Sequence, residues 1–242
     1  MEIGDKIFNE EIALVPDFKF TSRVANVFDD MVTRSVPYYM EIQRMIGELA
    51  GDHHQPGTVI YDLGCSTGAT MIHMDHFVPA DIVFTGIDDS ESMLNKCRSK
   101  LEEYHIERKV NLVCADLNEN INVENGSVVV LCLTLQFIRP INRLKLLKQI
   151  FSGMNEGGVL ILVEKVLAED SVFNRKFIKY YYDFKRRNNY SELEISQKRE
   201  ALENVLIPYK LSENITLLKE AGFSIVDTFF KWYNFAGIIA QK

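Results

Sequence analysis

The sequence predicts a single α/β domain built on a doubly wound, Rossmann-like and mostly parallel sheet of seven strands. From about residue 58, short β-branched segments alternate with longer helical segments, which is the pattern of consecutive βαβ units. The segment "VIYDLGCSTGATMI" (59–72) ends a strand in an acid and a glycine loop, as expected where the first strand turns into the first helix. The segment "AGFSIVDTFFKWYNFAGIIAQK" (221–242) contains two strands with a turn near 232–234, and it predicts a C-terminal antiparallel hairpin.

The elements of the core follow in a regular order along the chain. Ser90 is the expected N-cap of a helix at 91–104, because a serine hydroxyl can accept a hydrogen bond from the first amides of a helix. The segment "NEGG" at 155–158 is interpreted as the glycine stop of a later helix. Strands are expected at 58–63, 81–88, 109–116, 126–137 and 157–166, with helices at 67–78, 91–104 and 141–154.

Two segments lie outside this core. Residues 1–57 are predicted to form an N-terminal helical cap, with helices at about 22–31 and 37–52. Residues 168–206 are predicted to form a helical insertion, with its extra helices at 170–205 and with many aromatic and basic residues. No Pro-, Gly- or Ser-rich linker separates either segment from the core, so residues 1–242 are interpreted as one domain.

The composition excludes several classes of function. A formal net charge of −7 argues against direct binding of a nucleic-acid backbone, because such binding depends largely on surplus Lys and Arg. No apolar segment approaches the ~20 residues that a membrane span needs. Residues 1–10 lack the apolar region of a secretory signal, and the four cysteines show no metal-binding or disulfide spacing. We therefore expect a cytoplasmic protein that acts on small molecules without a membrane partner.

The glycine loop indicates the kind of ligand. A dinucleotide site carries G-x-G-x-x-G, so that backbone amides at a helix start can receive a pyrophosphate. Here the loop begins with Asp62 and keeps only the outer glycines, Gly64 and Gly68. An acid at this place repels a pyrophosphate and attracts an ammonium group. The loop therefore favours a ligand with an amino-acid end and a nucleoside end, of which S-adenosyl-L-methionine (SAM) is the common one.

Acids also end the next two predicted strands. Asp88 is expected to accept hydrogen bonds from both ribose hydroxyls, and Asp116 to contact the exocyclic amine of adenine. Leu117 and Met93 are the expected apolar walls beside the base. Any one of these acids alone is as readily explained as a cap or turn former. Three strand-end acids in succession, followed by a terminal hairpin, match the class I SAM-dependent methyltransferase architecture.

Residues outside the core narrow the function. The segments "DKIFNEEIA", "VANVFDDMVTRSVPYY", "LTLQFIRP", "YSELEISQKR" and "ALENV" together resemble the carboxy-S-adenosyl-L-methionine synthase family, from about residue 5 to the C-terminus. The resemblance implies a methyltransferase fold that does not transfer methyl groups. It implies that SAM and prephenate are converted into carboxy-SAM and phenylpyruvate, and that carboxy-SAM supplies a tRNA carboxymethyltransferase that modifies the wobble uridine.

The resemblance also implies roles for individual residues. Arg199, in "SQKR", would recognise the new carboxylate as a bidentate partner, and Tyr39 would close over the ligand. The sequence departs from the family pattern at Cys132, where the family has Asn near the sulfonium, at Asp89 and at Tyr38. The cofactor-binding set implied is Tyr39, Asp62, Gly64, Cys65, Ser66, Asp88, Asp89, Met93, Asp116, Leu117, Cys132 and Arg199.

Alternatives remain open at this point. Cys132 favours a second hypothesis, a SAM-dependent methyltransferase acting on a small molecule or tRNA, and a third is a non-catalytic SAM-binding protein. The helical segment 170–205 is expected to pack against its mate in a homodimer. The segment "KRR" at 185–187 could attract a dianionic substrate such as prephenate, although a solvated face is the default interpretation. His73 and His76 have the spacing of metal ligands without a third partner, so no metal is expected.

Overall fold

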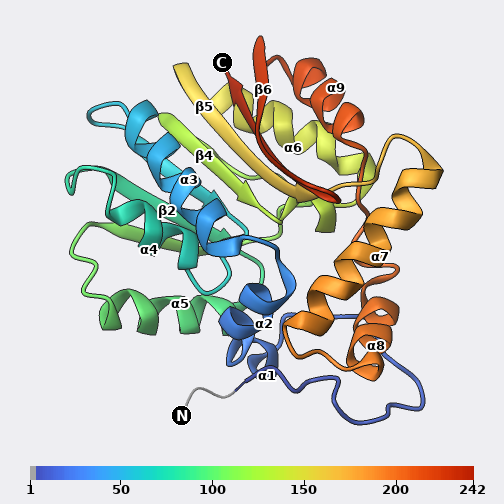
Figure 1. Cartoon of the computed structure of the whole chain (residues 1–242). Helices are drawn as coiled ribbons and strands as arrows, with labels where there is room; N and C mark the ends of the chain where they lie inside the picture. The colour runs from blue at the N-terminus through green and yellow to red at the C-terminus, as the bar shows by residue number, and fades with distance from the viewer. Residues whose placement is uncertain (1–3) are drawn as a thin grey trace.

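The computed structural model describes residues 4–242, and it confirms the predicted seven-stranded sheet (Figure 1). The strand order is β3-β2-β1-β4-β5-β7-β6, and β7 runs antiparallel to both of its neighbours, so the C-terminal hairpin is confirmed. The strands are β1 (Val59–Leu63), β2 (Val83–Asp88), β3 (Val110–Cys114), β4 (Gly126–Cys132), β5 (Met154–Lys165), β6 (Ile225–Trp232) and β7 (Phe235–Gln241).

Helices cover both faces of the sheet. The elements outside the strands are α1 (Ser22–Ala25), α2 (Phe28–Ser35), α3 (Tyr39–His53), α4 (Ala69–Asp75), α5 (Glu91–Glu103), η1 (Leu135–Phe137), α6 (Pro140–Gly153), α7 (Ser171–Arg187), α8 (Glu192–Leu202) and α9 (Leu211–Ala221). Helices α3, α4 and α5 pack on one face and α6 and α9 on the other. Ser90 is the N-cap of α5, as predicted, and its hydroxyl accepts a hydrogen bond from the Met93 amide at 3.3 Å.

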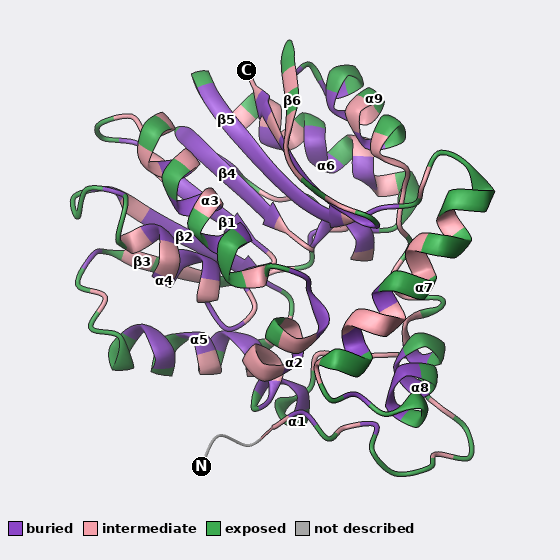
Figure 2. Cartoon of the chain, viewed as in Figure 1, coloured by how far each residue is buried: buried purple, intermediate pink, exposed green. Residues whose placement is uncertain are grey.

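The central strands are apolar along their whole length because both of their faces are covered. In β4, Val128 and Val130 pack against the α3 side, whereas Val129 and Leu131 pack against the α6 side. Figure 2 shows that β4 and β5 are buried along most of their length. This alternation fixes which side chains face each layer of helices. The candidate site lies at the carboxyl ends of the strands.

Three predicted boundaries were wrong. Residues 155–158 are the irregular start of β5 and not a helix stop, because α6 already ends at Gly153. A side chain at Gly153 would collide with the Val123 carbonyl, so close backbone packing places a glycine there. The strand expected at 126–137 stops at Cys132 and continues as the short helix η1. The single helix expected at 22–31 is two helices, α1 and α2.

The N-terminal segment and the helical insertion hold each other. Figure 1 shows α7 and α8 beside α1 and α2. The Ala201 carbonyl accepts a hydrogen bond from the Phe18 amide at 2.9 Å, and the Gln197 side chain accepts one from the Ile12 amide at 2.7 Å. Within the described part of the chain, no helix is long and apolar enough to cross a membrane.

Candidate functional site

A cavity of about 370 Å³ lies at the carboxyl ends of the parallel strands. Its lining comes from the loop after β1, from the ends of β2, β4 and β5, and from α2, α7 and α8. Strands β1 and β4 are adjacent in the sheet although they are far apart in the chain, and ligands of open α/β sheets bind at such a switch point. The volume falls in the range of small-molecule sites.

The glycine loop is held in a conformation that its sequence makes possible. Gly64 and Gly68 have φ angles of 78° and 81°, a region that residues with a side chain rarely adopt. A side chain at Gly64 would overlap Thr134, and one at Gly68 would approach Cys97. The loop therefore passes close to its neighbours and lines the cavity with Gly64, Cys65 and Ser66, whose amides already donate hydrogen bonds to the Ile87 carbonyl and to Asp88.

Asp88 fixes this loop. One carboxylate oxygen accepts a hydrogen bond from the Ser66 amide at 2.9 Å, and the other accepts one from the Ser90 amide at 2.9 Å. Both carboxylate oxygens of Asp88 thus already accept one hydrogen bond from the protein, which the sequence did not indicate. Each oxygen keeps a second lone pair that a ligand could use. Asp89, the next residue, also lines the cavity, and no other residue of 4–242 donates a hydrogen bond to its carboxylate. Burial raises the pKa of Asp89.

The two residues predicted at the adenine lie at the cavity wall. Leu117 is buried and lines the cavity. Asp116 lines it as well, and one of its oxygens accepts hydrogen bonds from the Asn118 amide at 2.8 Å and the Asn118 side chain at 2.9 Å. The prediction for Met93 was wrong, because Met93 is fully buried among apolar residues of α1 and α2 and does not line the cavity. Apolar residues of α1, of α2 and of the segments before them pack around Met93, which lies near the start of α5.

Asp62 lies beneath the cavity wall and not in it. Its side chain is 1% exposed, and one carboxylate oxygen has no hydrogen-bond partner in the described chain. Burial, together with the charge of Asp88, raises the pKa of Asp62 to about 7. Tyr39 and Cys132 do line the cavity. Burial raises the pKa of both side chains, and the charge of Asp62 adds to each shift.

Gln43 is a neighbour of this site that sequence reasoning missed. Its side-chain amide donates a hydrogen bond to the Cys132 sulfur at 3.6 Å, and its oxygen is buried without a partner. Gln43 stands four residues after Tyr39, so both project from one face of α3. That spacing is the signal by which the sequence could have indicated it.

The opposite end of the cavity is basic. Arg199 is exposed at the surface of α8 and lines the cavity, as do Lys165, Lys185 and Lys198. Lys185 is 5% exposed, so the solvated face predicted for "KRR" at 185–187 was wrong for its first residue. Arg186 does face solvent, where it pairs with acidic residues. The cavity therefore joins an acidic end below the strands to a basic end beside α7 and α8.

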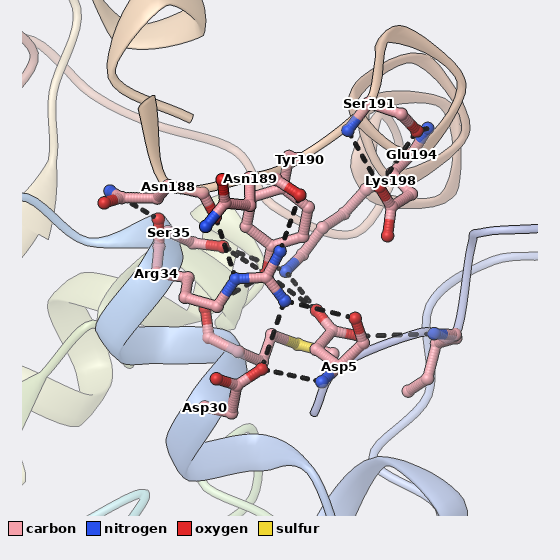
Figure 3. A network of polar contacts seen from close by, with 12 residues as sticks. Asp5, Asp30, Arg34, Ser35, Asn188, Asn189, Tyr190, Ser191, Glu194 and Lys198 are labelled. Atoms are coloured by element: carbon pink, nitrogen blue, oxygen red, sulfur yellow. Dashed lines mark hydrogen bonds and ion pairs between the residues drawn. The ribbon is translucent and has the colours of Figure 1, made fainter. Parts of the chain in front are cut away.

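A polar network ties the basic end to the N-terminal segment, and Figure 3 shows its members pointing toward one another. Lys198 pairs with Asp5 at 3.6 Å and donates to the Ser35 hydroxyl at 3.1 Å. The Tyr190 hydroxyl donates to Asp5 at 2.7 Å, and the Arg34 guanidinium stacks over the Tyr190 ring. Residues 5, 34–35 and 190–198 are thus held as one unit beside the cavity.

The two histidines with metal-ligand spacing lie at the end of α4. His73 is half-buried in its last turn, and His76 is its exposed C-cap. Within residues 4–242, no group of three or more His, Cys, Asp and Glu side chains is arranged to hold a metal ion.

Comparisons with known proteins place the chain among its relatives. A methyltransferase domain family matches residues 60–158. The carboxy-S-adenosyl-L-methionine synthase of Methylococcus capsulatus is 55% identical over 98% of this chain and 99% of that protein. The protein of the same name from Desulfotalea psychrophila is 44% identical over 93% of this chain and 92% of that protein. Among solved structures, an O-methyltransferase family protein from Burkholderia thailandensis is similar with a TM-score of 0.67 at 14% identity, covering 91% of this chain and 60% of that chain, which shows the fold alone.

Proposed function

This chain belongs to the carboxy-S-adenosyl-L-methionine synthase family, and from that premise we propose that it converts SAM and prephenate into carboxy-SAM and phenylpyruvate. It is a transferase with the class I methyltransferase fold, and SAM is the substrate that family and fold imply. The observation that carries the proposal is the cavity with an acidic end and a basic end.

The acidic end fits SAM. Gly64–Ser66 line the cavity where the methionine end of SAM would lie, and the Asp62 carboxyl is buried beneath them, where the ammonium group of SAM would favour its charged form. Asp89, assisted by Asp88, suits the ribose hydroxyls, because a carboxylate accepts hydrogen bonds from both. Asp116 and Leu117 suit the adenine. Tyr39, from the first turn of α3, stands beside Cys132 and closes this end.

The basic end fits a carboxylated product. Arg199 lines the cavity, and no residue of 4–242 forms an ion pair with its guanidinium. A guanidinium binds a carboxylate through two parallel hydrogen bonds. Such a charge-assisted contact contributes roughly 1.5–3 kcal/mol, which favours carboxy-SAM over SAM about tenfold or more.

The proposed reaction balances without a further reactant. Bound SAM supplies a methyl carbon beside a positively charged sulfur. The bond between the prephenate ring and its carboxyl group breaks, and the ring becomes aromatic as it expels hydroxide. The carboxyl carbon joins the methyl carbon, and the methyl proton leaves with the hydroxide as water. The protein orients the two substrates and excludes competing nucleophiles. Burial raises the pKa of the Cys132 thiol and keeps it uncharged, so this cavity-lining sulfur does not attack the methyl group.

The test is direct. Purified protein is incubated with SAM and prephenate, and mass spectrometry is used to search for a nucleoside heavier than SAM by one carbon dioxide. The same mixture without prephenate is the control. A folded protein that binds SAM and gives no such product contradicts the proposal.

One observation favours a second candidate, a SAM-dependent methyltransferase. Cys132 replaces an amide-bearing side chain beside the expected sulfonium position, and a thiol is a weak hydrogen-bond donor. Formation of S-adenosylhomocysteine from SAM and an added acceptor distinguishes methyl transfer from carboxylation. Tight SAM binding without either product would instead indicate a SAM-binding protein without turnover.

Three further points belong to the proposal. Exposed aromatic side chains of α7 and of the β6–β7 turn, Phe173, Tyr180 and Tyr233, support a homodimer through this surface. The carboxymethyl group of carboxy-SAM suits transfer to a wobble uridine by a second, tRNA-binding enzyme, while the net charge of −7 argues against tRNA binding by this chain. We also propose a cytoplasmic protein with a single domain of residues 1–242, of which 1–3 lie outside the described residues. The support for one domain is that no Pro-, Gly- or Ser-rich linker separates the two helical segments from the core.

A further inference from the structure

Two buried or half-buried lysines at the basic end of the cavity, Lys165 and Lys185, have no acidic or hydrogen-bonding partner for their ammonium groups among residues 4–242. Lys185, in the last turn of α7, is 5% exposed and lines the cavity. Its ammonium nitrogen lies 4.8 Å from the centre of the Tyr181 ring and 6.0 Å from that of Tyr190. Lys165, at the end of β5, also lines the cavity, and its nitrogen lies 5.1 Å from the same Tyr181 ring.

The two nitrogens form a pair across one ring. Because both approach the Tyr181 centroid, they lie within roughly 10 Å of each other. Neither nitrogen takes part in a hydrogen bond or an ion pair with any residue of 4–242. Lys198 differs, because Asp5 and Ser35 already engage it. Burial lowers the pKa of both Lys165 and Lys185, and repulsion from Lys198 and then from Lys165 lowers the pKa of Lys185 further.

A structural role alone does not account for this arrangement. Removing an ammonium group from water is costly unless it is paired with an anion. The contact with the Tyr181 ring offsets only part of that cost. Two like charges gathered at one cavity wall therefore indicate a site for an anion that arrives with a ligand.

The second substrate of the proposed reaction has two acid groups, and only one is transferred. Arg199 suits the carboxyl group that joins SAM. The other, on the pyruvyl side chain, stays on the product phenylpyruvate and needs its own partner. Resting on the proposed function, we infer that Lys165 and Lys185 hold the retained 2-oxo-acid carboxylate of the second substrate and so orient the ring carboxyl group toward the SAM methyl carbon. The two lysines are positioning residues and touch no atom whose bond is broken.

Phenylpyruvate is a probe that distinguishes the two proposed carboxylate sites, because it carries the retained carboxylate and lacks the transferred one. Wild-type protein is first shown to form carboxy-SAM from SAM and prephenate. In Lys185→Met and in Lys165→Met, we expect the KM for prephenate to rise and inhibition by phenylpyruvate to weaken, each about tenfold or more, because a charge-assisted contact is lost. The affinity for SAM should stay within about twofold, since SAM occupies the other end. In Arg199→Ala, inhibition by phenylpyruvate should be unchanged while carboxy-SAM binding falls.

Lys179→Met is the matched control, because Lys179 lies on the same helix and is exposed. It should behave as wild type in every assay. Thermal melting is used to check that each variant is folded. If Lys185→Met does not fold, Lys165→Met alone tests the inference, with the same expected rise in KM and loss of phenylpyruvate inhibition. If wild type forms carboxy-SAM but both lysine variants keep the wild-type KM and phenylpyruvate inhibition, the inference is wrong and the proposed function stands. Equal losses for SAM and phenylpyruvate would make the pair structural. If wild type forms no carboxy-SAM, the proposed function fails, and calorimetric binding of phenylpyruvate to wild type and variants still decides whether the lysines hold an anion.

Discussion

Asp62 is the buried acid beneath the proposed amino-acid end of the SAM site, and its titration is measurable. Burial, with the charge of Asp88 adding to it, raises the pKa of this carboxyl from 3.8 to about 7. The folded protein therefore holds a proton on Asp62 at a pH where the unfolded chain has lost it. The free energy of unfolding that this group contributes is highest at low pH and is lost as the pH rises from the unfolded pKa toward the folded pKa.

The size of the effect follows from these two pKa values. Across the whole window, a shift of about three pH units corresponds to about 4 kcal/mol at 1.36 kcal/mol per unit. Between about pH 5.5 and pH 8, where the native protein can be handled, about 2 kcal/mol of that loss should appear. Asp62→Asn removes the titrating group and should remove this part of the pH dependence.

The assay is urea denaturation of wild type and Asp62→Asn at both pH values. The stability of the variant relative to wild type should be about 2 kcal/mol more favourable at the higher pH than at the lower. Asp52→Asn, which changes an exposed carboxylate on α3, is the control and should show no such change. Parallel pH profiles for wild type and Asp62→Asn would refute the reasoning. In wild type, SAM should also stabilise the protein more as the pH rises through 7, because its ammonium group favours the charged carboxylate.

Three other substitutions test separate parts of the site. Arg199→Ala should abolish the preference for carboxy-SAM, a loss of about tenfold or more in its affinity measured by calorimetry, while SAM affinity stays within about threefold. Gly64→Ala should lower the melting temperature and weaken SAM binding, because its φ of 78° costs a side chain about 1–2 kcal/mol and the new methyl group meets Thr134. Tyr190→Phe should lower the free energy of unfolding by about 1–3 kcal/mol, since its hydroxyl donates to buried Asp5.

Each of these has an outcome that contradicts it. Equal losses for SAM and carboxy-SAM would make Arg199 a structural residue. A Gly64→Ala protein that melts and binds SAM as wild type does would show that the loop has room for a side chain. An unchanged unfolding curve for Tyr190→Phe would show that the network of Figure 3 adds no stability.

The sequence predicted the acidic half of the site because that half is local. Each acid follows its own strand, and parallel strands bring their carboxyl ends to one edge of the sheet. Asp89 and Asp116 therefore line the cavity as expected. The glycine loop could also be predicted from local sequence. Gly64 and Gly68 stand where the backbone adopts conformations that a side chain disfavours.

Apart from Arg199, which the family resemblance implied, the basic half could not be placed at the cavity because it depends on packing between distant segments. In the sequence, Lys185 is one cation of "KRR", for which a solvated face was the default interpretation. In the structure its ammonium nitrogen lies near Tyr181, four residues earlier on the same helix, and α7 packs against α2 and α8. In the sequence, Lys165 is a polar residue near the end of the strand predicted at 157–166. Met93 was placed at the base for its position after Asp88, whereas residues 24–31 fold over it. The Lys185–Tyr181 contact is local, since the two residues are four apart on one helix, but the sequence carries no local signal of the contacts between segments.

The position of β7 has a consequence for how the molecule acquires its shape during synthesis. This strand is translated after both strands that flank it, yet it is the only link between β5 and β6 in the sheet. While the ribosome still holds Phe235–Gln241, the edge of β5 remains open and Lys165 lacks the neighbour that aligns it. An incomplete chain therefore presents a bare strand edge, which is prone to aggregate. We expect deletions that remove β7 to yield insoluble protein, even though the glycine loop and its acids are intact.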